Sequence, residues 1–153
     1  MKILGIIDED FVNYKKPCMT IEFPYCDFKC GQQVCQNSLL ADADKIEIDE
    51  KNIVKRYMQN DISQALCCQG LEPFDSWWDL IKLLKEFRKE TDDDIVIYTG
   101  YTEEECLQKT ATLIGLFNNV IVKFGRYVPN QESHYDDVLG VNLSSNNQYA
   151  KRL

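Results

Sequence analysis

The chain has 153 residues, of which 44% are hydrophobic and 27% are charged, and its formal net charge is −8. This length and composition suit one globular domain, so we expect a single domain over residues 1–153. No apolar run approaches the roughly 18 residues of a membrane helix, and an acidic chain without a basic cluster argues against a nucleic-acid partner. We therefore expect neither a membrane nor a nucleic acid as partner.

The first residues and the cysteines indicate the compartment. The opening segment, MKILGIIDED, has a short apolar stretch that acids interrupt at once, which is too short for a secretory signal. The seven cysteines, an odd number, then fit metal ligands or buried thiols in a reducing compartment better than they fit disulfides. The sequence predicts a cytoplasmic protein.

Short apolar runs alternate with helical patterns along the first half of the chain. The first run, 19–23, predicts a strand, and an amphipathic stretch over 49–61 predicts a helix. A second strand is expected over 64–68. The helix after it should begin with a capping box formed by Ser76 and Asp79.

The same alternation continues in the second half. A third strand is expected over 95–98, followed by a second capping box, Thr102 with Glu105, and another helix. A fourth strand is expected over 120–124. The polar remainder of the chain predicts only a short strand over 138–143.

This order predicts the fold class and the position of a site. Strands separated by helical crossovers run parallel, and a chain this short cannot close an eight-stranded barrel of about 250 residues. We therefore expect an α/β fold, an incomplete βα barrel of parallel strands with helices on its outer face. Loops at the carboxyl ends of parallel strands meet at one edge. These loops are 26–35, 70–73, 98–101 and 123–126.

Three cysteines, Cys26, Cys30 and Cys35, lie within ten residues after the first strand. Three thiolates on one loop can ligate three irons of a four-iron cluster and leave the fourth iron open to another ligand. Zinc is the alternative, but a structural zinc site would need a fourth protein ligand from outside the loop. The candidates for that ligand are Cys18, Cys67, Cys68 and His134.

Taken together, four motifs resemble those of the radical S-adenosylmethionine enzymes, and specifically of the small activating proteins of anaerobic ribonucleotide reductase. The resemblance covers most of the chain and is more specific than any motif alone. The motifs are the three cysteines, Gly70-Leu71-Glu72-Pro73, Tyr98-Thr99-Gly100-Tyr101 and Ser144-Ser145-Asn146-Asn147-Gln148.

The resemblance implies a set of site residues. Cys26, Cys30 and Cys35 would ligate a [4Fe-4S] cluster, whose fourth iron binds S-adenosyl-L-methionine, and no catalytic residue is implied beyond these ligands. By position, Lys123 and Asn142 are further candidates for contacts with the adenosyl group. The cofactor-binding residues that the resemblance implies are Asn37, Gly70, Leu71, Glu72, Pro73 and Thr99.

The resemblance also implies an oxidoreductase reaction and its partners. An electron from a low-potential donor such as flavodoxin would cleave the cofactor to a 5'-deoxyadenosyl radical. This radical would install a glycyl radical on the large subunit of anaerobic ribonucleotide reductase. The alternatives are an activase for another glycyl-radical enzyme, a small cofactor-cleaving enzyme acting on a peptide or nucleoside, and a non-catalytic iron–sulfur or zinc binding module of the same fold.

Two positions depart from the family pattern. The usual spacing is CxxxCxxC, whereas here four residues, 31–34, separate the second and third cysteines. We expect a bulge around Gly31 to absorb the extra length. Leu71 stands where a second glycine is common, and it still supplies its backbone groups provided its φ is negative.

Overall fold

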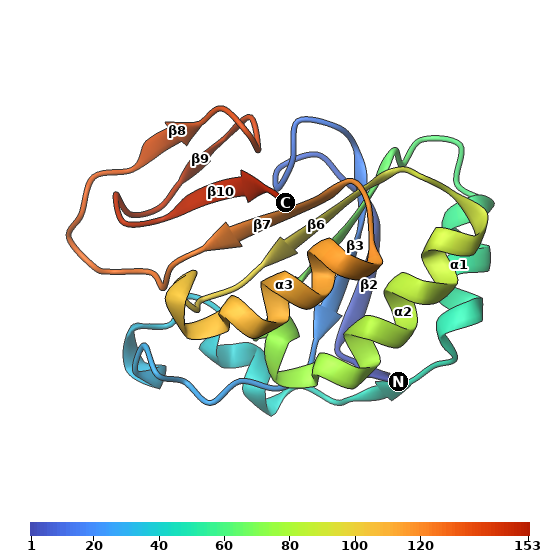
Figure 1. Ribbon diagram of the computed structural model, residues 1–153. Coiled ribbons are helices and arrows are strands. Elements are labelled where there is room, and N and C mark those ends of the chain that lie inside the picture. Colours follow the sequence, from blue (N-terminus) through green and yellow to red (C-terminus); the bar gives the residue numbers. More distant parts are fainter.

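A six-stranded mixed sheet forms the centre of the computed structural model, which describes residues 1–153 (Figure 1). The strand order is β10-β7-β6-β5-β3-β2. In chain order the strands are β2 (Gly5–Asp10), β3 (Cys18–Phe23), β5 (Ala65–Gly70), β6 (Asp94–Tyr98), β7 (Val120–Phe124) and β10 (Tyr149–Arg152). The four central strands run parallel, as predicted, and the edge strands β2 and β10 pair antiparallel with their neighbours.

Three helices, α1 (Glu50–Met58), α2 (Trp77–Glu90) and α3 (Leu107–Leu116), cover one face of this sheet (Figure 1). All three were predicted, α1 from its amphipathic pattern, and α2 and α3 with capping boxes at their beginnings. Leu80, Leu84 and the other buried positions of these helices form the larger core with the near side of the sheet. None of the helices combines the length and the apolar content that a membrane crossing requires.

The two predicted capping boxes have different outcomes. Thr102 and Glu105 exchange the expected hydrogen bonds, with Thr102 N donating to Glu105 Oε2 (2.8 Å) and Glu105 N donating to Thr102 Oγ1 (3.3 Å). The prediction at Ser76 was wrong, because a 3₁₀ turn, η3 (Pro73–Ser76), leads directly into α2. Glu72 caps that turn by accepting from Phe74 N, and Ser76 Oγ makes no hydrogen bond.

A second, smaller core lies on the sheet face opposite the helices. Cys18, Cys67 and Val96 contribute to it from the central strands. The chain between β2 and β3 and the hairpin of β8 (His134–Asp136) and β9 (Val141–Leu143) also contribute buried residues to this core. A further short pair joins β1 (Lys2–Ile3) to β4 (Ile46–Glu47).

The polar ends of the chain contain more strand than predicted. The strand expected over 138–143 is shorter, because residues 137–140 form a turn and only β9 is extended. β2, β8 and β10 were not predicted, since their sequences contain charged residues and lack a long apolar run. The two outer strands, β2 and β10, do not pair with each other. The description as an incomplete βα barrel stays a prediction.

Candidate functional site

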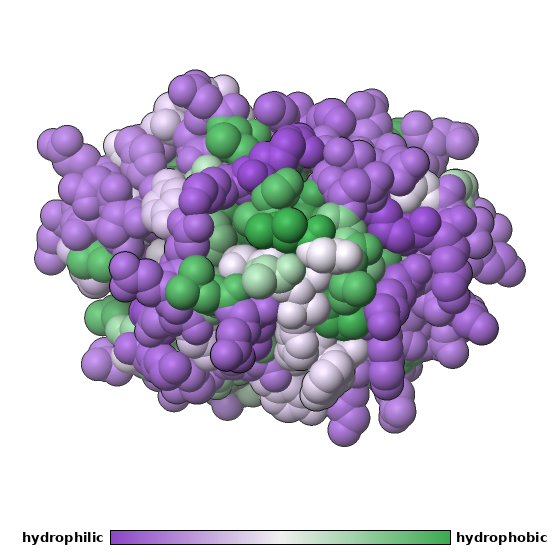
Figure 2. All heavy atoms as spheres, viewed as in Figure 1, coloured by the Kyte–Doolittle hydropathy of each residue, from purple (hydrophilic) through white to green (hydrophobic).

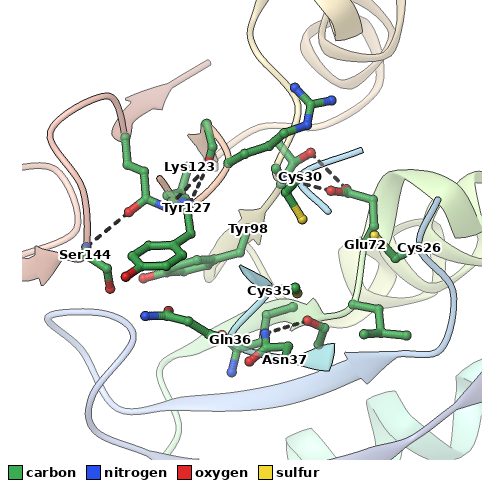
Figure 3. Close-up of a pocket in the computed structure, with 18 of the residues that line it drawn as sticks. Cys26, Cys30, Cys35, Gln36, Asn37, Glu72, Tyr98, Lys123, Tyr127 and Ser144 are labelled. Carbon is green, nitrogen blue, oxygen red and sulfur yellow. Dashed lines mark hydrogen bonds between the residues drawn. The ribbon is translucent and has the colours of Figure 1, made fainter. Parts of the chain in front are cut away.

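A cavity of about 370 Å³ lies at the carboxyl ends of the parallel strands. Segments that follow β3, β5, β6 and β7 all contribute to its wall, as the strand order predicted. Figure 3 shows Cys26, Cys30 and Cys35 around this cavity, with Lys123 and Ser144 on the side away from Cys26. Of the predicted site residues, those that line the cavity are Cys26, Cys30, Cys35, Asn37, Gly70, Leu71, Glu72, Thr99, Lys123 and Asn142. Pro73 does not line it and is buried at the start of η3.

The cysteine loop is tightly wound. Phe28 and Gly31 both have positive φ angles, 51° and 86°, and Gly31 N donates to Phe28 O (2.8 Å). Residues Gln32–Val34 then form a 3₁₀ turn, η1, so the expected bulge is instead one helical turn. A 3₁₀ turn rises only about 2 Å per residue, so the longer second gap does not carry Cys35 away from the cavity.

Hydrogen bonds fasten this loop to the beginning of α2. Asp27 N donates to Asp75 Oδ2 (2.9 Å), and the Tyr101 hydroxyl bonds to Asp75 Oδ1 (2.6 Å) and to Asp27 Oδ2 (3.2 Å). Within the loop, Phe28 N donates to Cys26 Sγ (3.2 Å). Backbone N–H groups that point at sulfur stabilise thiolate ligands and tune iron–sulfur clusters.

The three cysteines are partly buried. Burial raises the pKa of Cys26 to about 11, and burial together with the neighbouring Cys35 raises the pKa of Cys30. Without metal these two groups are therefore thiols at neutral pH, and a metal centre must displace their protons on binding. Loading of the site should accordingly depend on pH.

The spread of the three sulfurs distinguishes a cluster from a single ion. The three sulfurs do not lie within 4.8 Å of one another, and the group that does is Cys26 with Asp27 and Asp75. A zinc ion needs all its ligands about 2.0–2.3 Å from one centre, whereas a four-iron cluster holds each thiolate on a separate iron. The arrangement therefore fits a cluster better than it fits one zinc ion.

The candidates for a fourth zinc ligand all lie outside the cavity. Cys18, Cys67 and Cys68 are fully buried in the central strands, and His134 lies on β8. Cys106 precedes α3, and its thiol donates to Thr102 O (3.0 Å). No other cysteine or histidine therefore shares the cavity with the cysteine loop.

The turn after β5 is packed against the chain that leads into the cysteine loop. Gly70 has a φ of 96°, and a Cβ there would lie 2.7 Å from Phe23 N, so only glycine fits. Leu71 has a negative φ, as its position requires, and its N–H donates to Phe23 O (3.1 Å). The Leu71 carbonyl accepts no hydrogen bond from the chain and remains available to a ligand.

Asn37 connects the cysteine loop to this turn. Its side-chain amide lines the cavity and donates to Gly70 O (2.8 Å). One hydrogen bond therefore joins the segment after β3 to the segment after β5. This contact assigns Asn37 a positioning role in addition to any contact with a cofactor.

Glu72 joins the turns that follow β5 and β6. It is 4% exposed, and its carboxylate accepts from Phe74 N (3.0 Å), Thr99 Oγ1 (2.8 Å) and Gly100 N (2.8 Å). Burial raises its pKa to about 7, although these three hydrogen bonds act in the opposite direction. The Thr99 hydroxyl therefore donates its only proton to Glu72.

Lys123 is a buried cation on the cavity wall. Its ammonium donates to Gly125 O (2.8 Å), lies 5.9 Å from the Tyr98 ring centre and has no carboxylate within salt-bridge distance. Burial lowers its pKa to about 8, and the charge of Glu72 opposes this shift. A buried ammonium without an ion pair is suited to binding an anionic group of a ligand.

The far end of the cavity contains residues that sequence reasoning did not identify. Val12 and Asn13, from the loop after β2, line the wall, and the Tyr98 hydroxyl donates to Asn13 O (2.5 Å). No sequence signal identified them, because β2 itself was not predicted. Gln148, which belongs to the Ser144–Gln148 motif of the sequence, also lines the cavity; it is buried, and its side chain bonds to Ser144 N (3.1 Å) and Gly125 O (3.3 Å).

Comparison with known families gives one match. A family model described as a 4Fe-4S single cluster domain matches residues 18–150. No curated protein and no solved structure matches the chain. The matched span begins with β3, ends within β10 and includes the cysteine loop and the segments after the other parallel strands.

Proposed function

The chain belongs to the family of 4Fe-4S single cluster domains, and from this we propose that it is a radical S-adenosylmethionine enzyme. Its reaction would form a 5'-deoxyadenosyl radical and install a glycyl radical on the large subunit of anaerobic ribonucleotide reductase. The observation that carries the proposal is the cavity, because it joins three cysteines to the Gly70–Pro73 and Tyr98–Tyr101 turns and holds no fourth cysteine.

The donor set fits the proposed cluster. Cys26, Cys30 and Cys35 would hold three irons, and the fourth iron would then be free to bind the amino and carboxylate groups of S-adenosyl-L-methionine. When bound, the cluster supplies a low-potential electron and the cofactor supplies the carbon–sulfur bond that this electron cleaves. The protein supplies position and electrostatics.

The chain's own groups suit a ligand with both an amino group and a carboxylate. The Leu71 carbonyl, which has no partner in the chain, would accept an N–H of the amino group, which keeps two hydrogens when its nitrogen binds iron. Lys123, buried and without an ion pair, would hold an anionic group. Glu72 and Asn37 would hold the cysteine loop and the turns after β5 and β6 in place around the Leu71 carbonyl and the Lys123 ammonium.

The far end of the cavity supports a peptide as the second substrate. Apart from Lys123, its wall there consists of uncharged residues, which include Asn13 of the loop after β2 and Asn142 of β9. Hydrogen abstraction needs the target carbon in contact with the radical, so a backbone glycine would have to enter from this side. Flavodoxin or a similar low-potential protein remains the proposed electron donor.

The test is anaerobic reconstitution with iron and sulfide, followed by dithionite and S-adenosyl-L-methionine. We expect about four irons per chain and release of 5'-deoxyadenosine, measured by chromatography. The Cys30→Ala variant should lose both. The Cys106→Ala variant is the matched control, because Cys106 lies outside the cavity, and it should keep both. Bound zinc without a cleavage product would contradict the proposal.

The same experiment separates the alternatives when the large subunit of anaerobic ribonucleotide reductase is added to it. A non-catalytic binding module would take up iron but release no 5'-deoxyadenosine. An activase for another glycyl-radical enzyme would release it but leave the ribonucleotide reductase without the glycyl radical signal in electron paramagnetic resonance. The proposed function requires all three results.

A further inference from the structure

A line of lysines lies along the exposed side of α2. Five residues of this helix are exposed, and four of them are Trp78, Lys82, Lys85 and Lys89. An α-helix turns about 100° per residue, so these four side chains fall within a sector of about 60° around the helix axis. We call these four residues the α2 stripe. The sequence did not reveal it, because buried residues separate its members along the chain.

The α2 stripe is positive in a chain that is otherwise acidic. Acidic residues outnumber basic ones by 25 to 17, yet the stripe contains no acid. Lys89 forms an ion pair with Glu86 at its side (2.6 Å), whereas Lys82 and Lys85 form none. Figure 2 shows the hydrophilic surface over α2 and α1. Like charges four residues apart, as in Lys85 and Lys89, destabilise a helix slightly, so helix stability does not account for the arrangement.

Trp78, at one end of the α2 stripe, is the most exposed aromatic residue of the chain. It is 76% exposed. The adjacent Trp77, by contrast, packs against Phe74 and the larger core. Tryptophan is among the residues that contribute most to binding at protein interfaces. An exposed tryptophan followed by lysines therefore has the composition of an apolar anchor with ionic contacts beside it.

The Trp78 end of the stripe is close to the cysteine loop. Asp75 lies three residues before Trp78, in the turn that leads into α2. The Asp75 carboxylate lies within 4.8 Å of Cys26 Sγ and accepts from Asp27 N (2.9 Å). No residue of the stripe lines the cavity. A protein bound to the stripe would therefore approach the Cys26 side of the loop from outside and leave the cavity open.

We propose that the α2 stripe is the docking surface for an acidic protein that donates the electron in the proposed reaction. Carboxylates of the donor would pair with Lys82 and Lys85, and an apolar pocket of the donor would receive Trp78. The donor would be oxidised by one electron, which passes to the cluster, and no bond forms or breaks in this step. The inference rests on the proposed function, because only a chain that holds a cluster requires a donor.

The size and charge of the stripe suit a transient redox contact. Trp78 and Lys89 are eleven residues apart, which is about 16 Å along the helix. Electron-transfer encounters are among the smallest specific protein interfaces, and complementary charges speed their formation. An acidic donor would be repelled over most of a chain whose net charge is −8. A local positive surface would therefore select the orientation in which the donor binds.

A nucleic acid is the other class of partner that lysines and an exposed aromatic ring could bind. Asp79, Glu86 and Glu90 border the stripe on one side, and a continuous line of phosphates would pass close to them. A protein surface can place its carboxylates opposite the lysines alone. The structure therefore favours an acidic protein, and an oligonucleotide serves as the competing probe.

Binding of a flavodoxin with an acidic surface to the full chain, with and without the reconstituted cluster, tests the docking surface. We expect binding to weaken as the salt concentration rises. Lys82→Glu should raise the dissociation constant, measured by isothermal titration calorimetry, about tenfold or more. Trp78→Ala should raise it similarly but keep the salt dependence, because the charges remain. Lys15→Glu is the matched control, because Lys15 is exposed outside the stripe and the net charge changes equally.

The choice of reductant separates this inference from the proposed function. Dithionite needs no docking surface, so Lys82→Glu should release 5'-deoxyadenosine at the wild-type rate with dithionite and about tenfold more slowly with reduced flavodoxin. If the wild-type chain releases none with dithionite, the proposed function fails, and flavodoxin binding still decides the docking surface.

Three results would overturn the docking proposal. The first is an unchanged dissociation constant in both Lys82→Glu and Trp78→Ala, with both variants folded by circular dichroism. The second is an equal loss of binding in Lys15→Glu, which would show that only the net charge matters. The third is tighter binding of a single-stranded oligonucleotide than of flavodoxin at the same salt concentration.

Discussion

Buried charged side chains at the two ends of the parallel strands differ in their ion pairing. At the amino end, Asp94 accepts hydrogen bonds from the Tyr14 hydroxyl (2.9 Å), the Lys16 ammonium (2.6 Å) and the Arg152 guanidinium (2.9 Å). Burial alone would raise the pKa of Asp94, but these contacts lower it to about 2. The Asp94 carboxylate is thus paired within the chain with both Lys16 and Arg152.

At the carboxyl end the charges are buried without ion pairs. Burial brings the pKa of Glu72 up to about 7 and the pKa of Lys123 down to about 8. Paired charges tie segments of the chain together, whereas unpaired buried charges cost stability and keep binding capacity for a ligand. We therefore expect the charged residues at the amino end to stabilise the fold and those at the carboxyl end to bind a ligand.

The largest effect is expected from Asp94→Ala. This change leaves the buried Tyr14 hydroxyl without its acceptor and Arg152 without its partner, and it removes the side-chain links from β6 to β10 and to the loop before β3. We expect a loss of about 3 kcal/mol in the free energy of unfolding, measured by urea denaturation of the metal-free chain. Iron content per folded chain should not change, and a loss of iron at normal stability would contradict the division between the two ends.

A smaller effect of the same group should appear in acid. Because the pKa of Asp94 is lowered from 3.8 to about 2 in the folded chain, its contribution is present above pH 3.8 and is lost as the pH falls toward 2. The wild-type chain should lose about 2 kcal/mol more than Asp94→Asn over that interval. Parallel denaturation series of the two proteins give the difference, and identical pH profiles would show that Asp94 is not the group responsible.

The parallel strands were predictable because they are buried on both faces. Every residue of β7 is buried, and such strands read as continuous apolar runs between turn residues. β2 and β10 have only one neighbouring strand in the sheet, and they were not predicted because their sequences contain charged residues. Because β2 was not predicted, Val12 and Asn13 in the loop after it were not identified as site residues.

The site was predictable at the level of segments but not of atoms. Parallel topology alone brings the four loops to one edge. Which groups remain free is decided by tertiary contacts, as with the Asn37 amide, which bonds to Gly70 O, and the Thr99 hydroxyl, which bonds to Glu72. The failed capping box at Ser76 has the same origin, because Glu72 had already capped the preceding turn.

A smaller change in stability is expected from Lys123→Met, and its sign tests whether the ammonium is buried at a cost to stability. At pH 7 the Lys123 ammonium is charged and buried without an ion pair, so methionine should stabilise the metal-free chain by about 1 kcal/mol in urea denaturation. Its folded pKa, about 8, lies below the unfolded value of 10.5, so wild-type stability gains from raising the pH between these values. The Met variant should lack that gain.

Lys16→Met is the matched control, because Lys16 is half-exposed and pairs with Asp94 (2.6 Å). Methionine there should lower stability by about 0.5–1 kcal/mol, the opposite sign to Lys123→Met. Lys123→Met should also weaken binding of S-adenosyl-L-methionine by the reconstituted protein about tenfold or more, whereas Lys16→Met should leave it unchanged. If Lys123→Met destabilises the chain and leaves cofactor binding intact, then the hydrogen bond to Gly125 O outweighs the burial of the ammonium. In that case both ends of the sheet would use their charges for stability alone.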